Sequence, residues 1–376
     1  MHSIEVVGPF KGFSGYDRHT REFVRQFLRQ GLGVQLTNLA GWSLEVPPPM
    51  REVCFDQLST PVNADTVLHF TMPVHVTTRP YKRNVNYTMF EADRIPKDWA
   101  IRAAATDLIV VPTESSFRAW RNSGVPEAKI RICPLGVDGS FFSERTEPLP
   151  LRGSEGEPVL SYRCRFLNIA ELRRRKNHLG LLRAWIRATK AKDNAILIVK
   201  LTVFDPYTLD QFQVDLTEMQ SRLGRFFADA APVIFLVDNI LSEEQLRSLY
   251  QTATHYFSMS KGEGWDLVMM EAAAAGLHLI APNHSAYASY LREEDAELIP
   301  ASLVPAVFES PMRREDQIFF DGVLWWQPDE NVAVEIIQRI IRSDGRGKLL
   351  PRDRIIAEYS WANAGHRLIQ ILEELG

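Results

Sequence analysis

Residues 260–276 read SKGEGWDLVMMEAAAAG, and this stretch decides how the fold is interpreted. An apolar run at 255–259 precedes it, two glycines form its first part, and an alanine-rich run at 267–275 forms the rest. A strand that turns tightly into a short apolar helix is typical of a parallel α/β sheet covered on both faces. The stretch therefore predicts one strand–turn–helix unit of an α/β fold.

The same stretch carries two glutamates. Glu263 lies at the turn, and Glu271 follows eight residues later inside the helix, between Met270 and Ala272. A carboxylate in apolar surroundings needs partners, because burying it unpaired is costly. Two neighbouring hydroxyls of a sugar are one suitable partner, since a single carboxylate can accept from both. A structural salt bridge is the alternative interpretation.

Short apolar runs alternate with helical periods on both sides of this stretch. The alternation predicts mostly parallel sheets with helices on both faces. Strands are expected at 4–7, 34–36, 67–70, 85–90, 108–111, 130–133, 166–170, 196–201, 233–236, 255–259 and 277–281. Helices are expected at 15–30, 95–105, 114–123, 178–189, 209–228, 242–252, 267–275, 331–343 and 361–375.

A polar segment at 139–158, rich in proline and glycine, interrupts the alternation. We interpret it as a linker between two domains. The expected architecture is α/β, with two doubly wound Rossmann-like domains, 1–138 and 159–359, facing a central cleft. Ligands in such sheets bind at the carboxyl ends of the strands, which makes that cleft the expected site.

Composition excludes several classes of protein. The chain has 376 residues, of which 45% are hydrophobic and 24% charged, and a net charge of −4. These values exclude a disordered or collagen-like chain and give no sign of nucleic-acid binding. The longest apolar candidate for a membrane span, 267–282, contains Glu271 and is too short. Cys54, Cys133 and Cys164 lack metal-site spacing and are expected to be reduced core residues.

Two further strand-to-helix turns carry residues suited to an anion. The first is the turn at 11–15, where Gly12 and Gly15 would let backbone N–H groups approach a phosphate; a simple tight turn is the alternative. The second is the turn at 171–177, which places four consecutive cations, 173–176, before a helix. Cations there oppose the helix dipole, which indicates a bound anion unless the turn is merely solvated.

Together these residues match a known family. The chain resembles the retaining, nucleotide-sugar-dependent glycosyltransferases of family 4 over nearly its whole length. The donor-site motif of that family is matched by Ser260, Glu263, Gly264, Trp265, Leu267, Glu271, Ala272 and Gly276. The segments 111–115, 130–138, 166–170, 175–177 and 359–361 resemble further landmarks of the family.

The resemblance implies the GT-B fold and assigns roles to individual residues. The C-terminal helix, about 360–376, is implied to cross back to the N-terminal, acceptor-side domain. Glu271 is implied to bind the ribose hydroxyls and Glu263 the hydroxyls of the donor sugar. The donor pocket is implied to include Gly12, Ser14, Gly15, Arg173, Arg175, Lys176, Gly264, Trp265, Asp266 and Leu267.

Three positions depart from the family pattern. Asp266 replaces the usual second glycine of the donor motif, and Glu171 stands where an arginine is usual. Arg173, Arg174 or Arg175 could supply that guanidinium instead. Glu91 occupies the position of a histidine that faces the donor sugar in many members, within a subset pattern of Glu…Pro…Trp over 91–99. His69 and His75 are nearby alternatives to it.

The implied reaction moves a sugar from a nucleoside diphosphate to an acceptor with retention of anomeric configuration. Lys176, Glu263 and Glu91 are the expected catalytic residues. No metal or other cofactor is expected. The expected partners are a UDP-, GDP- or ADP-sugar and a carbohydrate, lipid-linked or small-molecule acceptor, without nucleic acid. A cytoplasmic enzyme is expected, with contact to the inner face of a membrane as an option.

Two other functions fit the same residues. A GT-B sugar-nucleotide epimerase would convert the donor with no acceptor present. A non-catalytic nucleotide-sugar-binding scaffold would need no reacting groups. Retention of Lys176, Glu263 and Glu271 together argues against the scaffold, because a scaffold has no need to bury those charges.

Overall fold

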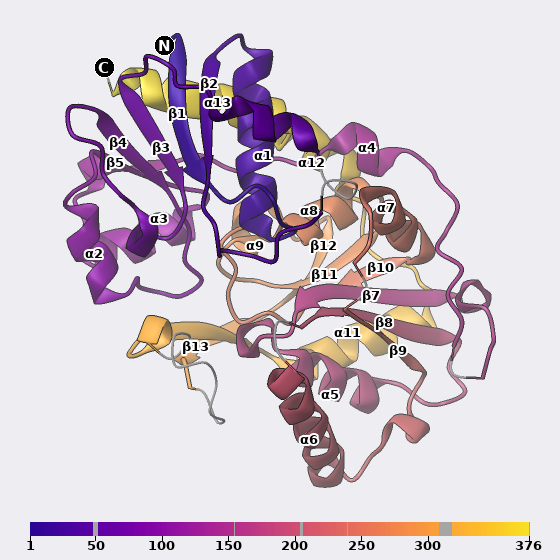
Figure 1. Ribbon diagram of the computed structural model, residues 1–376. Helices are drawn as coiled ribbons and strands as arrows, with labels where there is room; N and C mark the ends of the chain where they lie inside the picture. Colours follow the sequence, from indigo (N-terminus) through magenta and orange to yellow (C-terminus); the bar gives the residue numbers. More distant parts are fainter. Residues whose placement is uncertain (48–51, 154, 204–205, 239, 308–317, 376) are drawn as a thin grey trace. The chain divides into compact units, whose positions relative to one another are not determined.

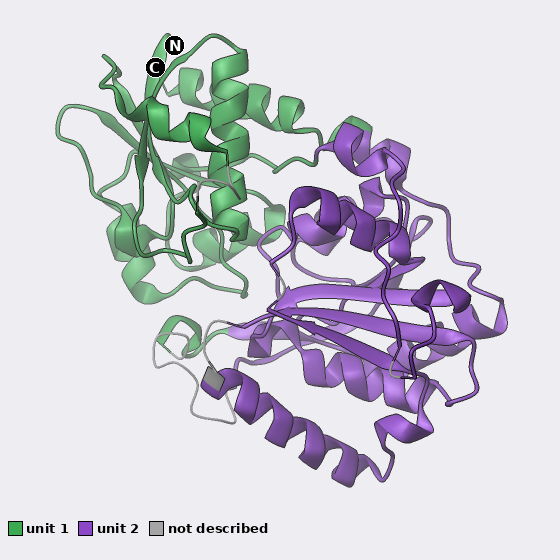
Figure 2. Ribbon diagram, turned by 45° about the vertical axis from the view of Figure 1, so that its right-hand side comes forward, with its two compact units in different colours: residues 1–137, 318–323, 357–376 green, residues 138–317, 324–356 purple. Residues whose placement is uncertain are grey.

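The computed structural model describes residues 1–47, 52–153, 155–203, 206–238, 240–307 and 318–375. The chain divides into two compact units, coloured separately in Figure 2. Unit 1 comprises Met1–Val137, Ile318–Val323 and Ala357–Gly376. Unit 2 comprises Asp138–Gln317 and Leu324–Ile356. Each unit contains its own six-stranded parallel sheet.

The sheet of unit 1 has the order β2-β1-β3-β4-β5-β6. Its strands are β1 Ser3–Gly8, β2 Gly33–Asn38, β3 Thr66–Phe70, β4 Arg83–Tyr87, β5 Leu108–Val111 and β6 Ile130–Ile132. The strand order reverses at β1, which pairs with both β2 and β3. Such a reversal leaves a crevice at the carboxyl ends of the strands, where α/β sheets bind ligands.

Helix α1, Gly15–Arg29, is packed against the C-terminal helix α13, Trp361–Glu374 (Figure 1). The rings of Phe23 and Trp361 meet edge to face at 5.6 Å. Gly365 permits the close approach, because a Cβ there would lie 2.5 Å from the Cβ of Gln26. The chain therefore returns to unit 1 at its last helix, as expected. The remaining helical segments of unit 1 are η2 Val53–Ser59, η3 Pro73–His75, α2 Lys97–Ala103, α3 Glu114–Asn122 and η4 Glu127–Lys129.

The sheet of unit 2 has the order β12-β11-β10-β7-β8-β9. Its strands are β7 Cys164–Glu171, β8 Ala195–Thr202, β9 Val233–Val237, β10 His255–Phe257, β11 His278–Pro282 and β12 Ala296–Ile299. An antiparallel pair, β13 Ala301–Pro305 and β14 Leu324–Pro328, follows β12. The buried face around Trp185 forms the core, and the Trp185 indole donates to the Ala231 carbonyl at 2.9 Å.

Helices surround this second sheet (Figure 1). They are α4 Gly139–Ser143, η5 Val159–Ser161, η6 Arg174–Lys176, α5 His178–Ala188, α6 Pro206–Leu223, η7 Phe227–Asp229, α7 Glu243–Thr252, α8 Leu267–Ala274, α9 Tyr287–Tyr290, α11 Glu330–Arg342 and α12 Arg352–Glu358. The expected alternation of strands and helices is thus confirmed. Most boundaries differ from the expected ones by a few residues.

Some features of the chain trace were not expected. Residues 139–158, interpreted as a linker, are counted in unit 2, where the Leu149 N–H donates to the Ser248 carbonyl at 3.1 Å. Residues 318–323 belong to unit 1, where Phe320 stacks on Phe90 at 5.0 Å and Phe319 meets Trp99 at 5.9 Å. Cys133 and Cys164 are buried, but the expected core position is wrong for Cys54, which the short segment η2 leaves exposed.

His19 is buried in the aromatic core of unit 1. Its ring lies 4.3 Å from that of Tyr87, 4.6 Å from that of Phe70 and 5.2 Å from that of Phe23. Neither ring nitrogen of His19 has a hydrogen-bond partner among the residues that the structure describes. Burial therefore lowers the pKa of His19 to about 3.

This burial predicts a loss of stability in mild acid. The unfolded chain takes up a proton on His19 near pH 6.5, whereas the folded chain does so only near pH 3. The unfolded state therefore binds more protons between these values, and stability falls as pH falls. From pH 7 to pH 5 this one residue should cost about 2 kcal/mol. Urea unfolding at pH 7 and pH 5 should show that His19→Phe loses less free energy of unfolding than wild type does, by about 2 kcal/mol. The exposed His366→Gln is the control, and an equal loss in wild type and His19→Phe would contradict the prediction.

Candidate functional site

The candidate site of unit 2 lies at the carboxyl ends of β7 and β10. These strands are parallel neighbours, so the loops that follow them leave the same edge of the sheet. Two hydrogen bonds join the loops. The Lys261 N–H donates to the Arg175 carbonyl at 2.8 Å, and the Asn177 side-chain amide donates to the Met259 carbonyl at 2.9 Å. The basic turn and the Gly-rich turn predicted from sequence are therefore one structure.

Glu263 is held between two cations. The Lys176 ammonium lies 2.6 Å from Oε1, and an Arg175 guanidinium nitrogen lies 3.0 Å from Oε2. The Glu263 side chain is 5% exposed. Burial alone would raise the pKa of Glu263, but Lys176 and Arg175 hold it below its usual value. Two cations therefore converge on one buried carboxylate, and cations fixed in this way can also bind an anionic ligand.

The other two arginines of the basic turn have different partners. Arg174 pairs with Asp215 of α6 at 3.0 Å, and Arg173 contacts Glu171. Arg175 is thus the arginine that the structure places beside Lys176 and Glu263. Asn177, in a left-handed conformation with φ 56°, turns the chain from η6 into α5. The cations consequently lie in a separate short turn before the helix.

Asp266 stands at the entrance to α8. Its φ of 70° is in the left-handed region, which aspartate tolerates better than most residues. Its carboxylate accepts from the Met269 N–H at 3.4 Å, which caps α8, and from the Tyr287 hydroxyl at 2.7 Å. Burial and the charge of Glu263 raise the pKa of Asp266. Since Tyr287 gives its hydrogen to Asp266, the Ser258 hydroxyl donates to Tyr287 across their 2.8 Å contact.

The remaining donor-motif residues pack around these two carboxylates. Gly264 and Trp265 are buried, and Leu267, half-buried, begins α8. The Trp265 ring lies 5.1 Å from that of Tyr290, whose hydroxyl donates to the Trp265 carbonyl at 3.0 Å. The contacts with Tyr290 therefore hold Trp265 and the turn in place.

Glu271 is buried in α8, with 4% of its surface exposed. The Tyr250 hydroxyl, from α7, donates to its Oε2 at 2.8 Å. This contact supplies one of the partners that a buried carboxylate needs. Tyr250 was not a candidate from the sequence, because nothing in its local pattern distinguishes it from a core aromatic.

Sequence reasoning also missed His284 and Ser285, which follow β11. The Ser285 hydroxyl accepts from the Glu263 N–H at 3.1 Å, and His284 contacts both Ser285 and Ser260. The position of His284 and Ser285 in the sequence could have identified them. Asn283, His284 and Ser285 come one residue after an expected strand, 277–281, and polar residues in that position share the edge at which ligands bind.

The turn between β1 and α1 in unit 1 is closed by Asp17. One Asp17 oxygen accepts from the Gly12 N–H at 2.7 Å, and the other accepts from the Ser14 N–H at 3.0 Å. Ser14 caps α1, and Gly15 begins it. Gly12 is required by packing, because a Cβ would lie 2.1 Å from the Ser43 hydroxyl. Two N–H groups of the expected phosphate turn are thus already engaged, and its binding role stays a prediction.

Glu91 lies in unit 1 near Tyr16. Burial raises the pKa of Tyr16, and the charge of Glu91 adds to that shift. The alternatives to Glu91 have different surroundings. His69 is buried in β3, where burial lowers its pKa to about 4. His75 is exposed, with its ring 5.4 Å from that of Trp42.

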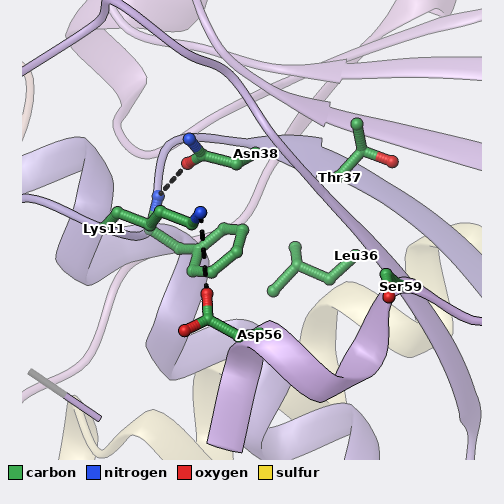
Figure 3. Close-up of a pocket in the computed structure, with 7 residues that line it drawn as sticks. Lys11, Leu36, Thr37, Asn38, Asp56 and Ser59 are labelled. Atoms are coloured by element: carbon green, nitrogen blue, oxygen red, sulfur yellow. Dashed lines mark hydrogen bonds and ion pairs between the residues drawn. The ribbon is translucent and has the colours of Figure 1, made fainter. Parts of the chain in front are cut away.

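A pocket of about 350 Å³ opens at the carboxyl ends of β1 and β2 (Figure 3). The side chains of Lys11 and Asp56 point toward each other across it, 3.7 Å apart. The Asn38 carboxamide accepts from the Phe10 N–H at 3.3 Å. The full lining is Phe10, Lys11, Leu36, Thr37, Asn38, Asp56 and Ser59. An aromatic ring beside hydroxyl, amide and balanced charged groups suits a small neutral ligand with several hydroxyls.

No group of three or more His, Cys, Asp or Glu side chains among the described residues is arranged to hold a metal ion. No helix in the described part of the chain is long and apolar enough to cross a membrane.

Comparison with known proteins identifies the fold. No family model and no curated protein matches the sequence. HepE from Anabaena, solved with UDP and glucose, has a TM-score of 0.66 at 11% identity, with both chains covered completely. Sucrose-phosphate synthase from Thermosynechococcus elongatus has a TM-score of 0.67 at 14% identity, covering 100% of this chain and 99% of that one.

A third similar structure is the lipopolysaccharide outer core galactosyltransferase WaaB in its apo form. Its TM-score is 0.61 at 12% identity, with 100% of this chain and 99% of that chain covered. These neighbours have the GT-B fold. Because the structural similarity extends over the full length of this chain, the chain has the GT-B fold too.

Proposed function

We propose that the chain is a glycosyltransferase, which moves a sugar from a nucleoside diphosphate to an acceptor with retention of configuration. The arrangement of Lys176 and Arg175 on the two oxygens of buried Glu263 carries this proposal. A diphosphate leaving group needs fixed positive charge, and a sugar needs a carboxylate that accepts from its hydroxyls. The GT-B fold, which HepE uses to bind UDP and glucose, supports the same reaction.

In this proposal the two cations change partners when the donor binds. Phosphate oxygens take over Lys176 and Arg175, and Glu263, thus released, accepts from the donor sugar. The negative charge that builds on the departing diphosphate then meets cations already in place, which lowers the barrier. Glu271 accepts from the ribose, while Asp266 and Trp265 hold the turn. Neither a metal nor another cofactor is part of the proposal.

Retention is proposed with the leaving phosphate as the group that takes the acceptor proton. No pair of carboxylates acting as in glycosidases is then required. Unit 1 is proposed to hold the acceptor, and Glu91 to face the reacting sugar. UDP-sugars are the first donors to test, because HepE was solved with UDP and with UDP-glucose.

The proposal predicts the effect of removing the ammonium of Lys176. Lys176→Ala should lower kcat by about two decades, because a charge contact to the transition state is worth several kcal/mol. Arg174→Ala is the matched control, since Arg174 faces Asp215 of α6. Its kcat should stay within about threefold of wild type. Steady-state kinetics with the best donor measures kcat for both variants. Near-normal turnover of Lys176→Ala would show that Lys176 has no part in the mechanism.

A second prediction concerns the donor base and Glu271. Thermal unfolding with UDP-, GDP- and ADP-sugars, and with the bare diphosphates, should show stabilisation by one nucleotide. At 100 times the dissociation constant the stabilisation should be about 2.7 kcal/mol. Glu271→Ala should lose most of it, while Glu243→Ala, exposed on α7, should keep it. Equal stabilisation of Glu271→Ala and wild type would show that Glu271 does not bind the ribose. No stabilisation of wild type by any nucleotide would count against the proposed function.

A third prediction concerns the pocket of unit 1 as the place where an acceptor sugar binds. Titration with neutral sugars such as glucose and sucrose, followed by amide NMR, should shift signals of Thr37, Asn38 and Ser59. Asp56→Asn should weaken these shifts, because it removes a charged acceptor from the lining. Shifts confined to unit 2, or unchanged in the variant, would exclude the pocket as a sugar site.

A further inference from the structure

We infer that His284 and Ser285 act as a positioning pair. The pair orients the Glu263 carboxylate and thereby controls how the site binds the donor sugar. The inference deepens the proposed function and rests on it for its catalytic meaning. Both residues lie between β11 and α9 in unit 2. They are nearly inaccessible, with 4% of His284 and 7% of Ser285 exposed.

The direction of each hydrogen bond follows from what the partners can do. His284 Nε2 lies 2.8 Å from the Ser260 carbonyl, which can only accept, so Nε2 carries the hydrogen. In a neutral imidazole Nδ1 is then an acceptor. Nδ1 lies 2.8 Å from the Ser285 hydroxyl, which therefore donates to it. The lone pairs of that hydroxyl are left to accept from the Glu263 N–H at 3.1 Å.

The ring of His284 is itself fixed from one side. It stacks on Trp326 of β14, with centroids 5.2 Å apart and planes 8° from parallel. The backbone N–H of Trp326 donates to the carbonyl of Lys261 at 2.8 Å, and Lys261 lies two residues before Glu263. The imidazole is thus held by β14, and its polar edge faces the backbone of residues 260 and 263. Burial lowers the pKa of His284 to about 4, so the ring is neutral at pH 7.

The backbone of Ser285 indicates that its hydroxyl matters. Its φ is 42°, in the left-handed region that favours glycine. Serine is more strained than glycine in this conformation. Glycine, however, would lack the hydroxyl. At this strained position the Ser285 hydroxyl joins His284 to the Glu263 N–H.

Two substitutions at Ser285 separate positioning from simple folding. Ser285→Ala and Ser285→Gly both remove the hydroxyl, but only Ser285→Gly relieves the left-handed strain. We expect Ser285→Gly to melt at a higher temperature than Ser285→Ala. Both should nevertheless lose about tenfold or more in kcat/KM for the donor, because the Glu263 N–H loses its acceptor. Affinity for the bare diphosphate should change much less than kcat/KM for the donor, because the diphosphate binds Lys176 and Arg175 and carries no sugar hydroxyls for Glu263 to accept from.

A purely structural role gives another pattern. In that case Ser285→Gly would recover the activity of wild type, and Ser285→Ala alone would be impaired. Combination with Glu263→Gln adds a further check, because the loss at Ser285 should disappear once Glu263 no longer acts. Recovery by glycine, or full additivity with Glu263→Gln, overturns the inference.

The protonation state and tautomer of His284 can be measured without an activity assay. Nitrogen-15 NMR of the imidazoles at pH 7 should show a neutral Nε2–H tautomer for His284, assigned by loss of its signals in His284→Gln. Its Nδ1 shift should change in Ser285→Ala and Ser285→Gly, which remove the hydrogen-bond donor. A protonated ring or an Nδ1–H tautomer overturns the positioning pair even if transfer is observed. If wild type transfers no sugar but shows this tautomer, the contact network stands and the proposed function fails.

Discussion

A buried carboxylate that must not be left unpaired is the constraint on which the rest of unit 2 depends. Glu263 is almost inaccessible to water, so leaving it charged and alone would cost several kcal/mol. Lys176 and Arg175 remove that cost, but only if the loops after β7 and β10 stay together. The backbone and amide contacts between these loops serve this condition. The same condition keeps two cations together in one turn, and fixed cations are what a diphosphate requires.

The fold class was predictable because it depends on periodicity. Apolar runs of three to six residues, separated by helical periods, recur along both halves of the chain, and they correspond to β1 to β11 and the helices between them. Glu271 was predictable as a candidate because a charged residue in an apolar run is conspicuous, and Glu263 because it lies in the glycine turn that precedes this run. Glu271 was expected to need a partner in its apolar surroundings, and the Tyr250 hydroxyl donates to it.

What could not be predicted depends on contacts distant in sequence. Nothing in the run of residues 173–176 says that Arg174 will turn to Asp215 while Arg175 turns to Glu263. Tyr250 resembles any core tyrosine until α7 is placed against α8. Asp17 resembles an ordinary first-turn acid, yet it takes the N–H groups of Gly12 and Ser14. Short pieces such as 318–323 carry no period long enough to show which unit they join.

The division of the chain into segments has a consequence for synthesis. Unit 1 is assembled from three segments, and the last of these, Ala357–Gly376, includes α13. On a ribosome all of unit 2 emerges before α13 does, so unit 2 can bury its own core while unit 1 still lacks Trp361 against Phe23. The segment Met1–Val137 is therefore translated before unit 2 but completes its packing after it. A nascent chain stalled before residue 361 would expose the apolar side of α1, which makes that interval the one in which a chaperone has most to protect.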